Sequence, residues 1–286
     1  MSFQHILFPI DFSARCNSTL PYVAEMAKRL DARITLLNVV VPYWYIPMPE
    51  TPPVMADIEP FRLSAERQLD RTFTKELERF DVTRRVEVGD PAQIITDCGQ
   101  QHGVDLVMMP THGYGAFRQL LLGSVTAKVL HDCNTAVWTG VHLEEPYQPS
   151  HADVKTILCA VNGAANCADL LVSAAALAGR VGAKLRLVHV VPAPSAWPDR
   201  QFDAPFEAAL AQDARREITD LQKSLGITAP LCIVFGDVAP ELREVAIQHE
   251  ADLILIGRGV IQGTLGRLRS HAYDIIRRSP CPVLSL

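Results

Sequence analysis

The residues best suited to chemistry lie between Pro110 and Thr126, where glycines and hydroxyl side chains gather. Gly113 and Gly115 let the backbone approach a ligand closely and adopt a positive φ. After nine residues, Gly123-Ser124 opens a predicted helix, whose first N–H groups and dipole favour an anion such as phosphate. The spacing therefore indicates a phosphate-binding turn, although taken alone it is explained more simply by a loop followed by a helix cap.

Two earlier positions could complete a nucleotide site. Asp11 follows the first predicted strand, and its carboxylate can accept from a ribose hydroxyl or a base amino group. Val39, at the end of the second predicted strand, offers an apolar wall for a purine. Ligands of doubly wound sheets bind beyond the carboxyl ends of strands, where the strand order reverses. We therefore expect Asp11, Val39 and the Gly123-Ser124 turn to lie close together.

An internal repeat sets the architecture that must position these residues. Ile6–Asp11 matches Ile157–Asn162 at an offset of about 150 residues, and Gly89-Asp90 later matches Gly236-Asp237. A chain of 286 residues is long enough for two domains. We predict domains at 1–141 and 154–286, joined by a linker over 141–153.

Short apolar runs alternate with helical patterns in each half. In the first half, strands are predicted at 4–10, 34–41, 83–88, 104–109 and 135–139. An apolar stripe predicts one helix over 61–80, Asp90-Pro91 opens another, and Leu121, Val125 and Val129 mark a third. The alternation predicts an α/β fold of two tandem doubly wound domains, each with a five-stranded parallel sheet flanked by helices.

Composition excludes several classes of protein. A formal net charge of −5 argues against a nucleic-acid binder, and no apolar run is long enough to span a membrane. The amino terminus carries no signal-peptide pattern, and seven cysteines without a CxxC pair are typical of reduced thiols, so we expect a cytoplasmic protein. No P-loop, GxGxxG turn after a first strand or GxSxG motif occurs. We interpret Asp90 as a helix cap and His131-Asp132-Cys133 as surface residues that bind no metal.

The Gly113–Gly123-Ser124 spacing resembles the nucleotide-binding signature of the universal stress protein family, which reads G-x-x-G, nine residues, then G and S or T. His5–Ser13 is similar to the opening strand of that family, and two such domains in one chain resemble its tandem type. The resemblance implies the fold of the HUP superfamily, related to adenine nucleotide alpha hydrolases. Pro110 replaces the first glycine of the signature, which removes a backbone donor but leaves a carbonyl.

The resemblance also implies a ligand and residue roles. The ligand would be ATP, with or without Mg²⁺. Asp11 would meet the adenosine moiety, Val39 would line the adenine pocket and Met109 would lie against the nucleoside. The ribose and phosphates would be surrounded by His112, Gly113, Gly123, Ser124 and Val125. The hydroxyls of Ser124 and Thr126 could donate to phosphate oxygens.

The second half departs from this signature. Asn162 stands where the first half has Asp11, and Val260, Ser270 and His271 stand where it has Gly113, Gly123 and Ser124. The glycines and arginines of 257–269 could cradle an anion in another geometry, but we favour a loop beside a degenerate site. We therefore predict one nucleotide per chain, in the first domain.

By this resemblance, the function is that of a nucleotide-binding regulator in the stress response, acting with an unidentified protein partner. No dedicated catalytic constellation is visible, and slow ATP hydrolysis is left open. The alternative is a ligand-free interaction protein that acts through protein–protein contacts. The halves are expected to pair within the chain through their last strands, over 135–138 and 282–285, as an intramolecular pseudo-dimer; a homodimer is allowed but not required.

Overall fold

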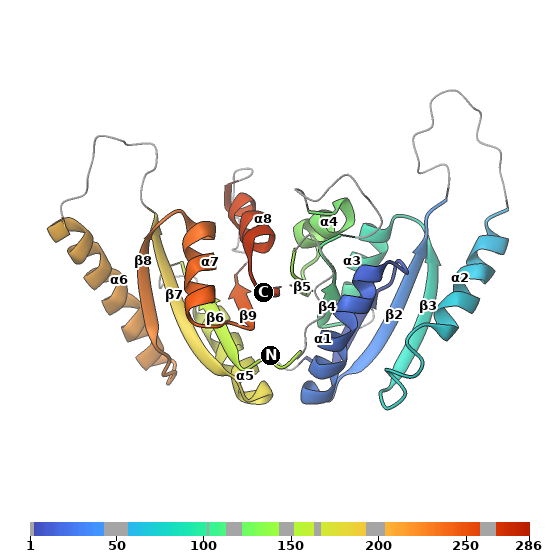
Figure 1. Cartoon of the computed structure of the whole chain (residues 1–286), viewed down its shortest axis with the longest axis horizontal. Helices are drawn as coiled ribbons and strands as arrows, with labels where there is room; N and C mark the ends of the chain where they lie inside the picture. The colour runs from blue at the N-terminus through green and yellow to red at the C-terminus, as the bar shows by residue number, and fades with distance from the viewer. Residues whose placement is uncertain are drawn as a thin grey trace, which may run out of the picture. The chain divides into compact units, whose positions relative to one another are not determined.

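The computed structural model describes residues 3–42, 57–101, 103–112, 122–142, 152–162, 167–192, 204–257 and 267–286. The chain divides into two compact units, whose main parts are Phe3–Trp138 and Asp153–Leu286. Each unit alternates strands and helices along the chain (Figure 1). The predicted linker over 141–153 lies mostly outside the described residues.

The first unit contains five strands and four helices among its described residues. They are β1 (His5–Pro9), α1 (Ala14–Leu30), β2 (Arg33–Val40), α2 (Glu59–Arg71), β3 (Val82–Val88), α3 (Pro91–Gln101), β4 (Leu106–Met109), α4 (Ser124–Asp132) and β5 (Ala136–Thr139). The strand order is β3-β2-β1-β4-β5, and β1 pairs in parallel with both β2 and β4. The five predicted strands and their parallel α/β arrangement are confirmed.

The second unit repeats the same succession. Its elements are β6 (Thr156–Ala160), α5 (Ala168–Val181), β7 (Lys184–Pro192), α6 (Ala204–Ser224), β8 (Leu231–Gly236), α7 (Val238–Gln248), β9 (Leu253–Ile256), α8 (Arg267–Arg278) and β10 (Val283–Ser285). The order β8-β7-β6-β9-β10 matches that of the first unit strand for strand. The duplication inferred from the sequence is therefore a duplication of fold.

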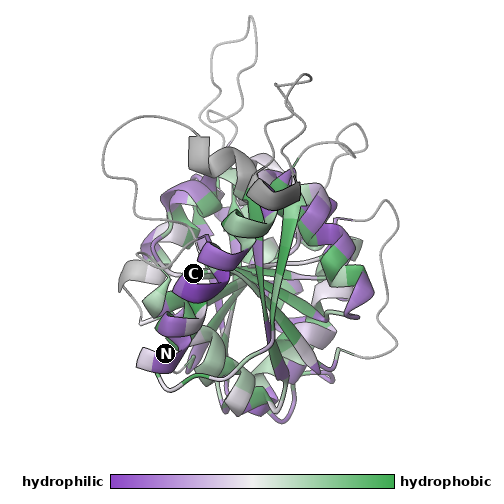
Figure 2. Ribbon diagram, turned by 90° about the vertical axis from the view of Figure 1, so that its left-hand side faces the viewer, coloured by the Kyte–Doolittle hydropathy of each residue, from purple (hydrophilic) through white to green (hydrophobic). Residues whose placement is uncertain are grey.

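Burial of the central strands supplies the core. Ile6, Leu7 and Phe8 of β1 are fully buried, and so are Leu253 and Ile254 of β9. Figure 2 shows hydrophobic residues concentrated in the strands and hydrophilic ones along the helices. Strands buried on both faces read as continuous apolar runs, which is why the sequence located them well.

The helix predicted over 61–80 is wrong in its second part. α2 ends at Arg71, because Thr72 is extended and Phe73 has a φ of 55°. The Phe73 ring instead stacks on Phe8, with ring centroids 6.1 Å apart. Phe61, which began the predicted apolar stripe, is 49% exposed. Residues 72–79 form turns, with Leu77 N–H donating to the Phe73 carbonyl at 3.1 Å, so the chain breaks the predicted helix at Phe73 while the Phe73 ring packs on β1.

Two aspartates hold the amino ends of the central strands in the same way in both units. The Asp105 carboxylate accepts from the backbone N–H groups of Gln4 and His5, at 2.7 and 3.0 Å. Asp252 accepts from Lys155 and Thr156, both at 2.8 Å. These bonds join β1 to the segment before β4, and β6 to the segment before β9.

Among the described residues, no helix is long and apolar enough to cross a bilayer.

Candidate functional site

The candidate site lies where the strand order of the first unit reverses. The chain runs from β1 outward through β2 to β3 and then returns to place β4 on the other side of β1. Asp11 follows β1, Val39 is near the end of β2, and His112 follows β4. The fold thus brings the carboxyl ends of these three strands to one edge of the sheet, the usual ligand position in such folds.

The turn after β1 is organised by Asp11. Its Oδ1 accepts from the backbone N–H of Ser13 at 2.9 Å and from the Cys16 thiol at 3.1 Å. Between them Phe12 has a φ of 61°, a strained conformation for a residue with a large side chain. Asp11 Oδ2 has no partner among the described residues. One carboxylate oxygen therefore holds the turn, and the other can accept from a ligand.

Asn38 ties the end of β2 to this turn. Its side-chain Nδ2 donates to the Ile10 carbonyl at 2.7 Å, and Ile10 N–H donates to the Leu37 carbonyl at 2.8 Å. Asn38 is buried. This amide fixes the position of the residue immediately before Asp11. The sequence interpretation assigned Asn38 no role; the signal was a polar residue inside an apolar strand.

The segment after β4 is bound to the start of α4 by two hydrogen bonds. Gly123 N–H donates to the Thr111 carbonyl at 2.9 Å, and the Thr126 hydroxyl donates to the Pro110 carbonyl at 3.1 Å. The suggestion that Thr126 donates to phosphate is therefore wrong, since its buried hydroxyl is used within the protein. Pro110 lacks a donor, but its carbonyl anchors the helix.

Gly123 is required by close packing. A Cβ at this position would lie 3.1 Å from both His112 Cα and the Thr111 carbonyl oxygen, and neither backbone atom can rotate away. Its φ of −58° is ordinary, so glycine is needed here for space and not for conformation. The sequence correctly placed Gly123 at a helix start.

The start of α4 presents unused backbone donors. The first hydrogen bond of the helix runs from Ala127 N–H to the Gly123 carbonyl, at 2.8 Å. The N–H groups of Ser124, Val125 and Thr126 precede it and have no acceptor among the described residues. Ser124 is exposed and makes no side-chain cap. The predicted helix N-terminus is confirmed, and its donors are free to meet an anion.

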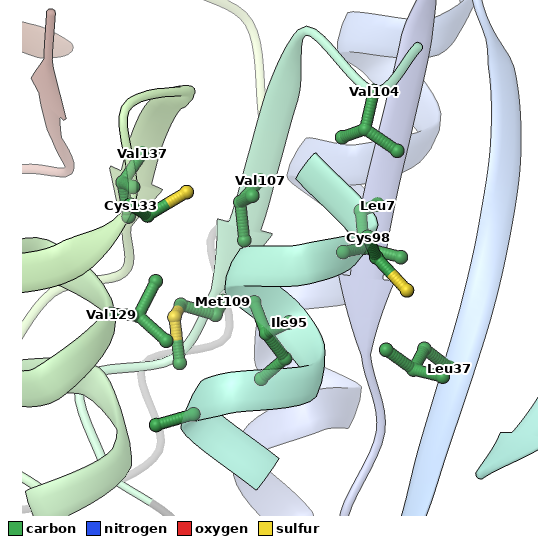
Figure 3. Close-up of a cluster of buried hydrophobic side chains, with 11 residues drawn as sticks. Leu7, Leu37, Ile95, Cys98, Val104, Val107, Met109, Val129, Cys133 and Val137 are labelled. Carbon is green, nitrogen blue, oxygen red and sulfur yellow. The ribbon is translucent and has the colours of Figure 1, made fainter. Parts of the chain in front are cut away.

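Two predicted contacts of the nucleoside differ in exposure. Val39 and Val125 are partly buried and pack against an apolar cluster of the first unit. Met109 belongs to that cluster and is 4% exposed; Figure 3 shows it between Ile95 of α3 and Val129 of α4. Val39 can therefore offer apolar surface to a ligand. Met109 mainly contributes to the buried cluster, and contact between Met109 and a nucleoside stays a prediction.

The remaining predicted residues are His112 and Gly113. His112 is buried, and its Nδ1 lies 2.8 Å from the Thr111 hydroxyl. Gly113 and the following residues to 121 lie outside the described part of the chain. The structure thus brings Asp11, Val39, His112, Gly123, Ser124 and Val125 to one edge of the sheet.

The Cys16 thiol remains protonated within the site. Burial raises its pKa to about 12, and the neighbouring Asp11 carboxylate contributes in the same direction. All seven cysteines are free, and six of them are buried. Cys16 is therefore a hydrogen-bond donor to Asp11 and not a nucleophile at neutral pH.

The second unit keeps the structural bonds of this site but loses the anion-binding turn. Cys167 Sγ lies 3.1 Å from Asn162 Oδ1, as Cys16 does from Asp11, and His189 Nδ1 lies 2.8 Å from the Val161 carbonyl, where the first unit uses Asn38. However, α8 begins at Arg267. Ser270 and His271, which correspond to Gly123 and Ser124, therefore lie inside the helix.

Other candidate sites from the sequence have structural explanations. Asp90 Oδ1 accepts from the N–H groups of Ala92 and Gln93, and its Oδ2 pairs with Lys128 Nζ at 2.9 Å, which confirms the helix cap. The Lys128 ammonium lowers the Asp90 pKa. His131 and Asp132 are exposed and hydrogen-bonded to each other. Cys133 is buried, so the interpretation as a surface residue is wrong at this position. The described residues contain no group of three His, Cys, Asp or Glu side chains that could hold a metal.

A separate cavity of about 730 Å³ lies at the opposite end of the first sheet. Its walls include Lys28, Arg33 and Arg79 as well as Asp31 and Asp81. The mixed charges indicate no single ligand class, and the cavity adjoins the amino ends of β1 and β2. It does not belong to the candidate site.

Comparison with known proteins identifies relatives of both halves. The profile of the universal stress protein family matches residues 2–139 and again residues 153–286. Universal stress protein MJ0577 of Methanocaldococcus jannaschii is 28% identical over 151 residues, covering 47% of this chain and 93% of the relative. A protein of Staphylococcus haemolyticus named for the same family is 26% identical over 158 residues, covering 53% of this chain and 94% of the relative.

Solved structures extend the comparison to the whole chain. A universal stress protein from Archaeoglobus fulgidus is 19% identical and covers 100% of this chain and 98% of its own, with a TM-score of 0.71. It shows the same fold. A universal stress protein in complex with cAMP is 19% identical and covers 49% of this chain and 97% of its own, with a TM-score of 0.36.

Proposed function

The chain belongs to the universal stress protein family, in its tandem form, and from that premise we propose that its first domain binds one adenine nucleotide and acts as a regulator. The observation that carries the proposal is the pairing of an acceptor with donors at the reversal point of the sheet. Asp11 Oδ2 is available there, and so are the first N–H groups of α4.

The Asp11 carboxylate and the first N–H groups of α4 suit the two ends of a nucleotide. A carboxylate oxygen accepts well from a ribose hydroxyl or an adenine amino group, and Val39 beside it offers apolar surface to the base. The N–H groups of Ser124, Val125 and Thr126 at the positive end of α4 suit phosphate. ATP fits this division of chemistry. The described residues supply no metal cluster, so we assign any Mg²⁺ to the phosphates of the nucleotide.

A regulatory output follows from the chemistry of the same residues. Hydrolysis of ATP requires a group that orients an attacking water. Asp11 uses one oxygen to hold the turn, and His112 is buried with its Nδ1 at the Thr111 hydroxyl. Each of these side chains is thus already engaged in a contact within the protein, which favours binding over catalysis. We therefore propose binding and slow or no turnover, in the cytoplasm.

Calorimetry with ATP and Mg²⁺ tests the proposal with two variants. One replaces the aspartate of the first domain by asparagine, and the other makes the reverse change in the second domain. Asp11→Asn keeps the Oδ1 acceptor that holds Ser13 and Cys16 but replaces the free acceptor with an amide donor. We expect affinity to fall about 10- to 100-fold, as for the loss of a hydrogen bond to a charged group. The matched control, Asn162→Asp, restores the carboxylate in the second domain and should add no second site.

A further variant, Ser124→Glu, tests the phosphate end. Ser124→Glu places a negative charge at the start of α4, where it repels phosphate but favours the helix dipole. ATP affinity should fall at least about 10-fold while the melting temperature stays the same or rises. No heat with the wild-type protein up to millimolar ATP would overturn the proposal and favour the ligand-free interaction protein.

A further inference from the structure

Strand β8 forms an unprotected edge of the second sheet. It pairs in parallel with β7 on one side, and no described strand pairs with its other side. Figure 1 shows β8 as the last strand of its sheet, next to α6. An open edge presents a row of backbone donors and acceptors, which natural proteins usually shield.

The side chains of β8 do not shield this edge. Leu231-Cys232-Ile233-Val234-Phe235 contains no charge, and each of these residues is only half-buried. The equivalent edge strand of the first unit, β3, carries Arg84, Arg85 and Glu87. Charged side chains on an edge discourage pairing with another strand. The two halves therefore differ in edge protection although they share one fold.

The register with β7 shows which backbone groups point outward. Leu187 N–H donates to the Pro230 carbonyl at 2.8 Å, and His189 and Val191 lie beside Ile233 and Phe235. In a parallel pair, alternate residues direct both N–H and C=O toward the neighbouring strand. Cys232 and Val234 therefore face β7, whereas Leu231, Ile233 and Phe235 face away from it. An independent contact agrees, since Arg215 Nη1 of α6 donates to the Leu231 carbonyl at 3.3 Å. Arg215 therefore covers this one carbonyl of the edge, and the outward groups of Ile233 and Phe235 stay open among the described residues.

We propose that β8 pairs antiparallel with β8 of a second copy of this chain, about a two-fold axis through Ile233. In this register Ile233 exchanges both backbone hydrogen bonds with Ile233 of the second copy. Leu231 of each strand then lies opposite Phe235 of the other strand. The Leu231 carbonyl then accepts from Phe235 of the other strand as well as from Arg215, because a backbone carbonyl oxygen has two lone pairs.

Self-complementarity favours a second copy over other occupants. An uncharged strand with outward groups spaced evenly about its central residue matches itself without a repulsive pair. Pairing of β8 with β3 of another chain would bring Arg85 and Glu87 alongside Val234 and its neighbours. A contact of β8 with itself about a two-fold axis uses the same edge of both chains, so it closes as a dimer and does not extend into a filament.

A designed crosslink tests the register. Cys232 would lie opposite Val234 of the second copy in a non-hydrogen-bonded pair, where Cα atoms are about 4.5 Å apart and within disulfide reach. Val234→Cys should therefore give a covalent dimer with two disulfides when copper phenanthroline removes two electrons and two protons per bond. The control Cys232→Ser/Val234→Cys should stay monomeric in denaturing electrophoresis, because identical positions are about 7–8 Å apart. Equal crosslinking of both variants, or of neither, would overturn the proposal.

A pair of proline variants tests the edge without new cysteines. Ile233→Pro removes an outward N–H that the fold does not use, so circular dichroism should be unchanged while the mass by light scattering halves. Val86→Pro changes the equivalent position of β3 and should leave the mass unchanged. If Ile233→Pro does not fold, Ile233→Lys makes the same test by charge. An unchanged mass for the folded Ile233 variant would contradict the dimer.

Discussion

Asp11 illustrates how one residue serves both structure and binding. Its Oδ1 accepts from Ser13 and Cys16, while Oδ2 has no partner among the described residues and is proposed to bind the ligand. The structural half of this role persists in the second domain, where Asn162 accepts from Cys167. Replacing aspartate by asparagine keeps the carbonyl-type acceptor and loses the second one. The turn is therefore retained where the binding function is proposed to be lost.

The raised thiol pKa of Cys16 predicts a loss of stability in alkali. The unfolded thiol ionises near pH 9, but the folded thiol keeps its proton to about pH 12. The thiol thus contributes stability fully below pH 9, and this is lost as the pH rises toward 12, with a slope up to about 1.4 kcal/mol per pH unit. Urea unfolding of Cys16→Ser between pH 9 and 11 should show a shallower decline than wild type. If the unfolding free energies of both proteins declined in parallel with pH, the result would contradict this role of the Cys16 thiol.

Gly123→Ala should destabilise the first domain. The added Cβ would lie 3.1 Å from two backbone atoms, His112 Cα and the Thr111 oxygen, so α4 must shift away from the end of β4. We expect the free energy of unfolding to fall by about 1–3 kcal/mol, as for overpacking at a tight site. Urea denaturation measures this, and Gly179→Ala, where a Cβ has open space inside α5, is the matched control. ATP affinity should fall with the shift of α4.

At the scale of elements, β2 is held to the turn after β1 by one side chain. Asn38→Leu would leave the Ile10 carbonyl buried without its donor, which should cost about 1–3 kcal/mol of unfolding free energy. Asn38→His should restore most of this loss, because His189 provides the same link to Val161 in the second domain. Urea unfolding of the three proteins gives the comparison. Equal losses for both substitutions would show that packing around Asn38, and not its hydrogen bond, is what matters.

The starts of α4 and α8 account for the proposed difference between the domains. α4 begins immediately after Gly123, so its first N–H groups stand at the end of β4. α8 begins at Arg267, which places the equivalent positions 270 and 271 within the helix, where their N–H groups enter the backbone ladder. From the sequence, the replacement of Gly123 and Ser124 by Ser270 and His271 was the expected reason. The position of the helix start supplies a further one.

At the scale of the whole molecule, one site per chain predicts uneven stabilisation. A ligand that binds only the folded state adds about 2.7 kcal/mol at 100 times its dissociation constant. Hydrogen exchange with saturating ATP should therefore slow for amides of β1 and β4 and remain unchanged for β6 and β9. Equilibrium dialysis should give one nucleotide per chain. Two per chain, or equal protection of both domains, would contradict the asymmetry. Pairing of the halves through their last strands stays a separate prediction.

The sequence by itself determined the duplication, the parallel α/β fold, the strand positions and the helix starts at Pro91 and Ser124, because buried strands and helix caps leave local patterns. Only the tertiary structure decided that α2 ends before Phe73, whose ring stacks on Phe8, that the Thr126 hydroxyl donates to the Pro110 carbonyl, and that Asn38 positions Asp11. These are contacts between segments from 16 to 65 residues apart, and no local pattern specifies such partners. Asp11 and the α4 start meet for the same reason: parallel strands bring distant residues to one edge of a sheet.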